Sequence, residues 1–212
     1  MAQSDDMSEK PTLSVVPADT PESDGRRARS ERSKLQIVDA LFRLIQEGNM
    51  DPSAASVAEE AAVGLRTVFR HFEDMDSLYR ELTARLEAEI LPIVMKPWAS
   101  ADWRERLHEL VARRAKIYER ILPFKVAANL RRYQSDWLMH DYRRFLTMER
   151  SGLHGILPDE VLADKGLSAA LEMVTGFQTW RRIRQDQGLE PKEAEAVLLR
   201  TVHALLVAID LR

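Results

Sequence analysis

The chain has 212 residues, which is enough for one large domain or two small ones with a sizeable core. Its 45% hydrophobic and 31% charged residues are typical of a globular protein in water, and no apolar run approaches the ~18 residues that span a bilayer. The absence of cysteine excludes disulfides, thiolate metal sites and thiol catalysis. Together with a polar, acidic N-terminus, this composition favours a cytoplasmic protein with no membrane role.

We expect residues 1–25 to be a disordered tail. Pro11, Pro17 and Pro21 occur there among Ser, Thr and acidic residues, with few large apolar groups to offset the entropy of ordering. The composition changes sharply at Arg26, where a short basic cluster precedes the first expected helix.

The remainder is predicted to be almost entirely helical. It lacks runs of alternating β-branched residues, and only 8 Gly and 9 Pro punctuate the whole sequence. We therefore expect an all-α fold of about nine helices, with Pro92 bending or interrupting one helix and Pro123 ending another. The expected helices are 31–47, two short helices within 53–72, 74–95, 103–121, 124–150 with a break near 133–135, 167–187 and 190–209.

The segment 53–72 is the most informative part of the sequence, because its pattern predicts two short helices joined by a tight turn. Ser53 is placed to cap the first helix through its hydroxyl. Two helices that meet at a steep angle can present the second one to a DNA major groove. The inward residues of this second helix are expected to be Val63, Val68 and Phe72, and its outward residues Leu65, Arg66, Phe69 and Arg70.

The turn between these helices has an unusual composition. It needs a left-handed backbone, which favours Gly, so Ala62 at this position would cost ~1–2 kcal/mol. Gly64 follows where the second helix must be capped, and it is a tolerated but not an optimal cap.

The segment resembles the DNA-binding region of the tetracycline-repressor (TetR/AcrR) family of bacterial regulators. The resemblance covers about 50 residues, in which the order and spacing of the helix-turn-helix follow the family. Its motifs are Ile37-Val38-x-Ala40, the Ser53 cap, Val57-Ala58-x-x-Ala61-x-Val63, Thr67-Val68-Phe69-Arg70-His71-Phe72 and Asp76-x-Leu78, with a looser match over 176–189.

The resemblance implies an all-helical homodimer with a DNA-binding domain at 26–78 and a ligand-binding and dimerisation domain at 79–212. Such a protein binds a palindromic operator in double-stranded DNA, with half-sites about 34–36 Å apart. It releases the operator, or changes its binding, when a small-molecule effector enters the body. No catalytic role and no cofactor are implied.

This chain departs from the family pattern at four positions. Members usually have Gly, Ser, Tyr and Lys where it has Ala62, Gly64, Phe69 and Met75. The Tyr hydroxyl and the Lys ammonium normally contact phosphates, so their absence removes two backbone anchors.

Contact with DNA then depends on where a few charges lie, because residues 26–80 hold nine basic and nine acidic side chains. Arg66 is the first candidate for reading a base, since Arg can bond guanine O6 and N7 together; a phosphate contact or a solvated surface position are its alternatives. The basic cluster before the first helix either reaches phosphates or a minor groove, or is ordinary linker charge. The expected DNA-binding residues are Ser53, Gly64, Leu65, Arg66, Thr67, Phe69, Arg70, His71, Arg26, Arg27 and Arg29.

Aromatic residues in the second half of the chain indicate an apolar or aromatic effector, if several of them line one pocket. Tyr118, Trp137 and Phe177 are the candidates; the alternative for each is a place in the core. The five His residues show no spacing typical of metal ligands, so we expect no metal site.

The two C-terminal helices, about 167–187 and 190–209, are apolar on more than one side. This favours a four-helix dimer interface with two helices from each chain, or alternatively burial of both sides within one subunit. An enzyme is not supported, because the chain has no Gly-rich phosphate loop and no nucleophile motif. The serious alternative is a degenerate helix-turn-helix protein that acts mainly through protein–protein contacts.

Overall fold

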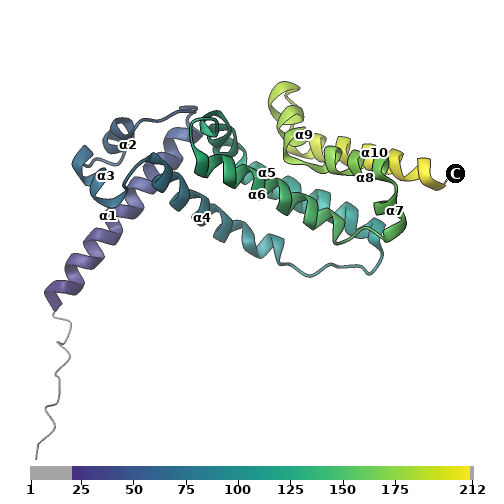
Figure 1. The fold of residues 1–212 in the computed structure, drawn as a ribbon, viewed down its shortest axis with the longest axis horizontal. Coiled ribbons are helices and arrows are strands. Elements are labelled where there is room, and N and C mark those ends of the chain that lie inside the picture. Colours follow the sequence, from purple (N-terminus) through teal and green to yellow (C-terminus); the bar gives the residue numbers. More distant parts are fainter. Residues whose placement is uncertain (1–20, 211–212) are drawn as a thin grey trace, which may run out of the picture.

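The computed structural model describes residues 21–210, apart from the side chains of residues 21–24, 26 and 208–210. Over this range the chain forms ten α-helices and one π-helix and contains no strand, which confirms the all-α prediction. Figure 1 shows an elongated molecule with α1–α3 at one end and α8–α10 at the other. The elements are α1 (Pro21–Gln46), α2 (Ala54–Glu60), α3 (Leu65–His71), α4 (Met75–Val94), α5 (Trp103–Arg131), α6 (Asp136–His154), α7 (Asp159–Ala163), α8 (Lys165–Thr175), α9 (Phe177–Arg181), the π-helix η1 (Arg182–Asp186) and α10 (Pro191–Asp210).

The first helix begins at Pro21, well before the predicted start at Glu31. Pro is favoured in the first turn of a helix, and the Arg-rich stretch that begins at residue 26 has high helix propensity. The last five residues of the predicted tail are thus helical, while residues 1–20 lie outside the described range. The N-terminal part of α1 projects away from the rest of the molecule (Figure 1).

The prediction that Pro123 ends a helix is wrong, because α5 continues through it to Arg131. Pro123 has no N–H and leaves the carbonyl of Glu119 without its helical donor. The residues on either side hold the helix in place: Ile121 is 3% exposed and Phe124 is fully buried. Their burial outweighs the local cost of the proline. In α4, Pro92 does not interrupt the helix either, which ends two residues later at Val94.

The predicted single helix over 167–187 is also wrong. The chain leaves helical geometry at Gly176, and a Cβ there would lie 3.0 Å from the carbonyl oxygen of Glu172. Two shorter elements follow, α9 and the π-helix η1. Side chains of α5 and α6 bind the backbone at this break, as described below, which a reading of local sequence does not reveal.

Two hydrophobic clusters form the core, and α5 contributes to both. The N-terminal cluster joins α1–α4 with Phe124 and Ala127 of α5 and Leu138 of α6. The C-terminal cluster surrounds Phe177 and Trp180 and includes residues from α5 through α10. The 29-residue α5 therefore connects the helix-turn-helix end of the molecule with the end formed by α8–α10.

Candidate functional site

Ser53 caps α2, as predicted. Its side-chain oxygen accepts a hydrogen bond from the backbone N–H of Ser56 at 3.1 Å. This bond satisfies one of the amide groups that the first turn of a helix leaves without a partner. The Ser53 side chain is exposed at the surface, so capping leaves it accessible.

The turn after α2 is a Schellman motif with an alanine at its left-handed position. Ala62 has φ +52° and is the one non-glycine residue with positive φ in the described chain. The N–H of Ala62 donates to the Glu59 carbonyl at 3.0 Å, and that of Val63 donates to the Ala58 carbonyl at 2.9 Å. The predicted left-handed turn is therefore confirmed, alanine included.

The end of α1 provides a direct comparison, because it uses the same motif with glycine. Gly48 has φ +98° and donates to the Ile45 carbonyl at 3.1 Å, while Asn49 donates to the Leu44 carbonyl at 2.9 Å. Glycine occupies this conformation without steric cost, and alanine does not.

The third helix has the two faces expected from the sequence. Val68 and Phe72 point inward, with 2% and 4% of their surface exposed. On the outer face, Leu65 is 45% and Phe69 51% exposed. The remaining outward residues are the exposed Arg66 and Arg70, and Thr67 is half-buried between the faces. Gly64 precedes the helix at its N-cap position and makes no side-chain cap bond.

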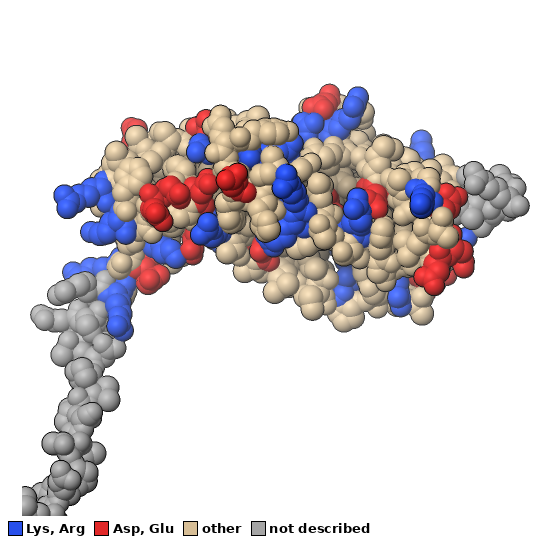
Figure 2. All heavy atoms as spheres, in the orientation of Figure 1, with Lys and Arg blue, Asp and Glu red and all other residues tan. Residues whose placement is uncertain are grey.

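Two arginines on the outer face of α3 lack the ion pairs that Lys34 and Arg43 form at this end of the molecule. Lys34 pairs with Glu81 at 2.8 Å, and Arg43 pairs with Glu60 at 2.6 Å. Arg66 forms no ion pair with any described residue, and neither does Arg70 on the next turn. Figure 2 shows basic side chains gathered at the α1–α3 end of the molecule. A locally neutral domain therefore presents unneutralised positive charge on one exposed helix face.

His71 differs from these arginines. It is half-buried, and its Nε2 is a buried nitrogen without a hydrogen-bond partner among the described groups. Burial, followed by the neighbouring Arg70, lowers its pKa below the ordinary value. The lowered pKa disfavours the charged imidazolium, which favours support of the fold over a cationic phosphate contact.

The basic cluster at the N-terminal side is part of a helix. The exposed Arg27 and Arg29 lie on α1, and Arg29 donates from Nε to the Gly25 carbonyl at 3.1 Å. The side chain of Arg26 lies outside the described residues. The predicted basic arm is thus the exposed N-terminal part of α1.

Two of the three candidate effector residues meet in the body. The rings of Tyr118 and Phe177 are both 2% exposed and pack edge to face, with centroids 5.5 Å apart. Trp137 lies apart from them, against the N-terminal cluster, with the Arg80 guanidinium 5.4 Å from its ring centroid. The structure therefore does not bring the three candidates into one site.

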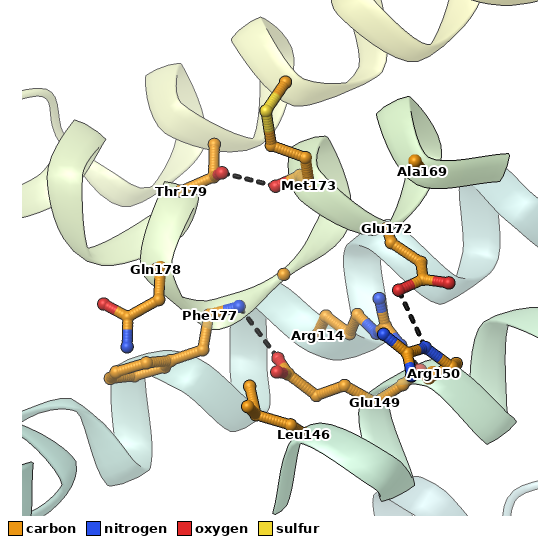
Figure 3. A pocket seen from close by; sticks show the side chains of 11 residues that line it. Arg114, Leu146, Glu149, Arg150, Ala169, Glu172, Met173, Phe177, Gln178 and Thr179 are labelled. Carbon is orange, nitrogen blue, oxygen red and sulfur yellow. Dashed lines mark hydrogen bonds and ion pairs between the residues drawn. The ribbon is translucent and has the colours of Figure 1, made fainter. Parts of the chain in front are cut away.

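Two clefts flank the pair of rings. The first cleft lies between α4, α5 and α6 and has a volume of about 340 Å³. The second cleft lies between α6, α8 and α9 and has a volume of about 350 Å³ (Figure 3). Tyr118 lines the first cleft and Phe177 the second, while Arg114 and Glu149 line both.

A buried polar network separates the clefts and holds the break between α8 and α9. The Arg114 guanidinium donates from Nη1 to the Thr175 carbonyl at 3.1 Å and to its hydroxyl at 2.6 Å. Tyr118 donates its hydroxyl to the Glu149 carboxylate and also lies 3.2 Å from the Thr175 carbonyl. The same Glu149 oxygen accepts the backbone N–H of Phe177 at 2.8 Å. Helices α5 and α6 thus bind the backbone groups that the break at Gly176 frees.

Sequence reasoning missed Arg114, Glu149 and Thr175. One signal for Arg114 was present, since it occupies an apolar position of the α5 stripe between Leu107 and Tyr118, at helical spacing from both. A charged residue in such a stripe indicates a buried charge with a specific purpose. Burial raises the pKa of Glu149 above its usual range, and the bonds from Tyr118 and Phe177 oppose that rise.

The described residues contain neither a cluster of metal ligands nor a membrane-spanning helix. No group of three or more His, Asp or Glu residues among them is arranged to hold a metal ion. Within residues 21–210, no helix is both long and apolar enough to cross a membrane.

Comparison with known proteins connects the fold to a regulator. No protein-family profile matches the sequence, and no curated protein matches it. The structure is similar to that of a transcriptional regulator from Rhodococcus sp. Rha1, with a TM-score of 0.61 and 18% sequence identity. The match covers 84% of this chain and 96% of that one. At this identity the similarity shows a shared fold.

Proposed function

We propose that this chain is a ligand-responsive transcriptional repressor that binds a palindromic operator as a homodimer. The observation that carries the proposal is the outer face of α3. It combines exposure, a rigid inward anchor at Val68 and Phe72, and two arginines without ion pairs. A surface of this kind fits the phosphates and base edges of a major groove.

Roles within this face follow from position and chemistry. Arg66 in the first turn of α3 reads a guanine, because recognition helices contact bases through their N-terminal residues. Arg70 and the exposed arginines of α1 contact phosphates, together with the Ser53 hydroxyl. Leu65 and Phe69 make apolar contacts in the groove, and no catalytic chemistry is involved.

Dimerisation would use α8 and α10. These two helices pack against each other and against the C-terminal cluster, yet each keeps an exposed apolar edge. Met173 of α8 is 69% exposed, and Val197 and Val207 of α10 are 39% and 40% exposed. An equivalent pair of helices from a second copy would bury these side chains in a four-helix arrangement.

The effector would occupy the first cleft. Its wall includes α5 and α6, and these two helices bind the break at the end of α8 through Arg114 and Glu149. A ligand there can shift the two subunits relative to each other and change the separation of the recognition helices.

Titration of the full chain onto its own promoter DNA tests the proposal. Arg66→Ala should lose roughly 1–3 kcal/mol of specific affinity, while binding to unrelated DNA falls much less. Arg143→Ala, an exposed arginine on α6, serves as the matched control and should bind normally. Binding that ignores both salt and DNA sequence, or an Arg66→Ala variant that binds like the parent, would favour the alternative of a protein–protein interaction module.

A further inference from the structure

Arg114 carries a buried positive charge that forms no ion pair with a carboxylate of the described chain. It is 7% exposed, and its three hydrogen bonds go to neutral oxygens: the carbonyl and hydroxyl of Thr175 and the backbone carbonyl of Glu149. The neighbouring Arg113 is equally buried but pairs with the Glu109 carboxylate at 2.6 Å. A buried cation without a counter-charge is costly, and a bound anion would lower that cost.

The nearest acid does not fill this role. The Glu149 carboxylate is turned to the Tyr118 hydroxyl and the Phe177 N–H, and only its backbone carbonyl meets the Arg114 guanidinium. Burial raises the pKa of Glu149, whereas the bonds from Tyr118 and Phe177 and the nearby charge of Arg114 lower it. The side chain therefore balances the Arg114 charge incompletely.

The remaining charges around the first cleft are already paired. Arg144 binds both Glu87 and Asp141, and Asp141 also binds Lys125 at 3.0 Å. With Arg113 paired with Glu109, Arg114 and Glu149 are the charged residues of the lining that form no ion pair within the described chain.

The wall beyond Arg114 is apolar. Ile90 of α4, Ile117 of α5, and Phe145 and Met148 of α6 line it together with Trp98. Leu91 and Val94 at the rim are 53% and 51% exposed, so the cleft is accessible from solvent along α4. Its volume of about 340 Å³ lies within the range of small-ligand sites.

We infer that the effector is an amphipathic carboxylate whose anionic end binds Arg114 and whose apolar part lies in the first cleft along α4 and α6. The inference rests on the proposed function, since it names the ligand class of the proposed effector site. A guanidinium has five N–H groups, of which three bond to described acceptors, leaving two donors for a carboxylate.

Matched probes test the charge preference on the full-length protein. Decanoate and 4-phenylbutyrate would be compared with the alcohols and amines of the same chain length by calorimetry and thermal shift. The carboxylates should bind, and the alcohols and amines should bind roughly tenfold or more weakly. Equal or tighter binding of an alcohol or amine, or no binding of either carboxylate, would overturn the inference.

Variants at Arg114 test whether the carboxylate binds at this side chain. Arg114→Gln should weaken decanoate binding by roughly tenfold or more, and Arg114→Lys should restore part of it. Arg106→Gln, on the same helix but outside both clefts, should bind decanoate as the parent does.

A variant at Glu149 keeps the test decisive if Arg114→Gln does not fold. Glu149→Gln retains an acceptor for Tyr118 but removes the competing negative charge, so decanoate should bind at least as tightly, with decanol unaffected. Weaker decanoate binding by this folded variant would contradict the inference.

Operator binding is measured on the same preparations. Absence of DNA binding by the parent protein would refute the proposed function, whereas intact DNA binding without carboxylate binding would refute the ligand class alone.

Discussion

Replacing Ala62 by glycine should stabilise the protein, although the substitution removes a methyl group from a helical protein. Ala62 sits at φ +52° in the turn between α2 and α3, where a left-handed backbone costs an alanine ~1–2 kcal/mol. Glycine removes this cost, but it also raises the conformational entropy of the unfolded chain, which lowers the free energy of unfolding by ~0.4–1 kcal/mol. The side chain is exposed, so the loss of its methyl group removes little packing.

The net expectation for Ala62→Gly is a gain of about 0.5–1 kcal/mol in the free energy of unfolding. For a chain of this size, that corresponds to a rise in Tm of roughly 1–4 °C. Urea unfolding followed by circular dichroism measures the gain, and an unchanged m-value would show that the unfolded state is comparable.

Ala84→Gly is the matched control, because Ala84 is exposed in the middle of α4 with ordinary helical geometry. It should lose roughly 0.5–1 kcal/mol. If Ala62→Gly destabilises the protein as Ala84→Gly does, the reasoning from the left-handed turn is refuted. DNA affinity should not change in either variant.

Three further predictions concern single side chains. The Tyr79 hydroxyl is buried without a hydrogen-bond partner among the described groups, and burial raises its pKa to about 12. Tyr79→Phe should therefore raise the free energy of unfolding in urea by ~1 kcal/mol. The variant should also lack one phenol that titrates near that pH when the titration is followed by ultraviolet absorbance. Burial alone would raise the pKa of Asp141, but Lys125 and Arg144 hold it below its usual value, so its contribution to stability is full above the unfolded pKa and is lost as the pH falls through the folded one. Asp141→Asn should accordingly lose about 3 kcal/mol at pH 7 and much less at acidic pH, and an equal loss at both would contradict this account. Phe69→Tyr, on the exposed face of α3, should raise operator affinity by ~0.5–1.5 kcal/mol in a DNA titration without changing Tm, if a phosphate lies within reach of the new hydroxyl.

The helix-turn-helix could be predicted from the sequence because its determinants are local. A cap at Ser53, a left-handed position at Ala62 and apolar residues spaced three and four apart act within one or two helical turns. The same local rules predicted the break between α5 and α6 and the two faces of α3. Tyr118 and Phe177 stay predicted effector residues, and their packing against each other in the C-terminal cluster did not follow from the sequence.

Local rules failed where distant contacts decide the outcome. Pro123 does not end α5, because the buried Phe124 belongs to a cluster with α1 and α4 that outweighs the lost hydrogen bond. Trp137 packs beside that same cluster rather than near the other aromatic candidates, which its position in the sequence does not indicate.

The sequence by itself determined the all-α class, the turn and the face of α3 that carries Arg66 and Arg70, since each depends on residues close together along the chain. Only the tertiary structure decided that Gly176 divides a helix and that Arg114 lies buried without a counter-charge. The physical reason is the same for both: the backbone at the break and the guanidinium of Arg114 are satisfied by groups on other helices, 28 to 61 residues away along the chain.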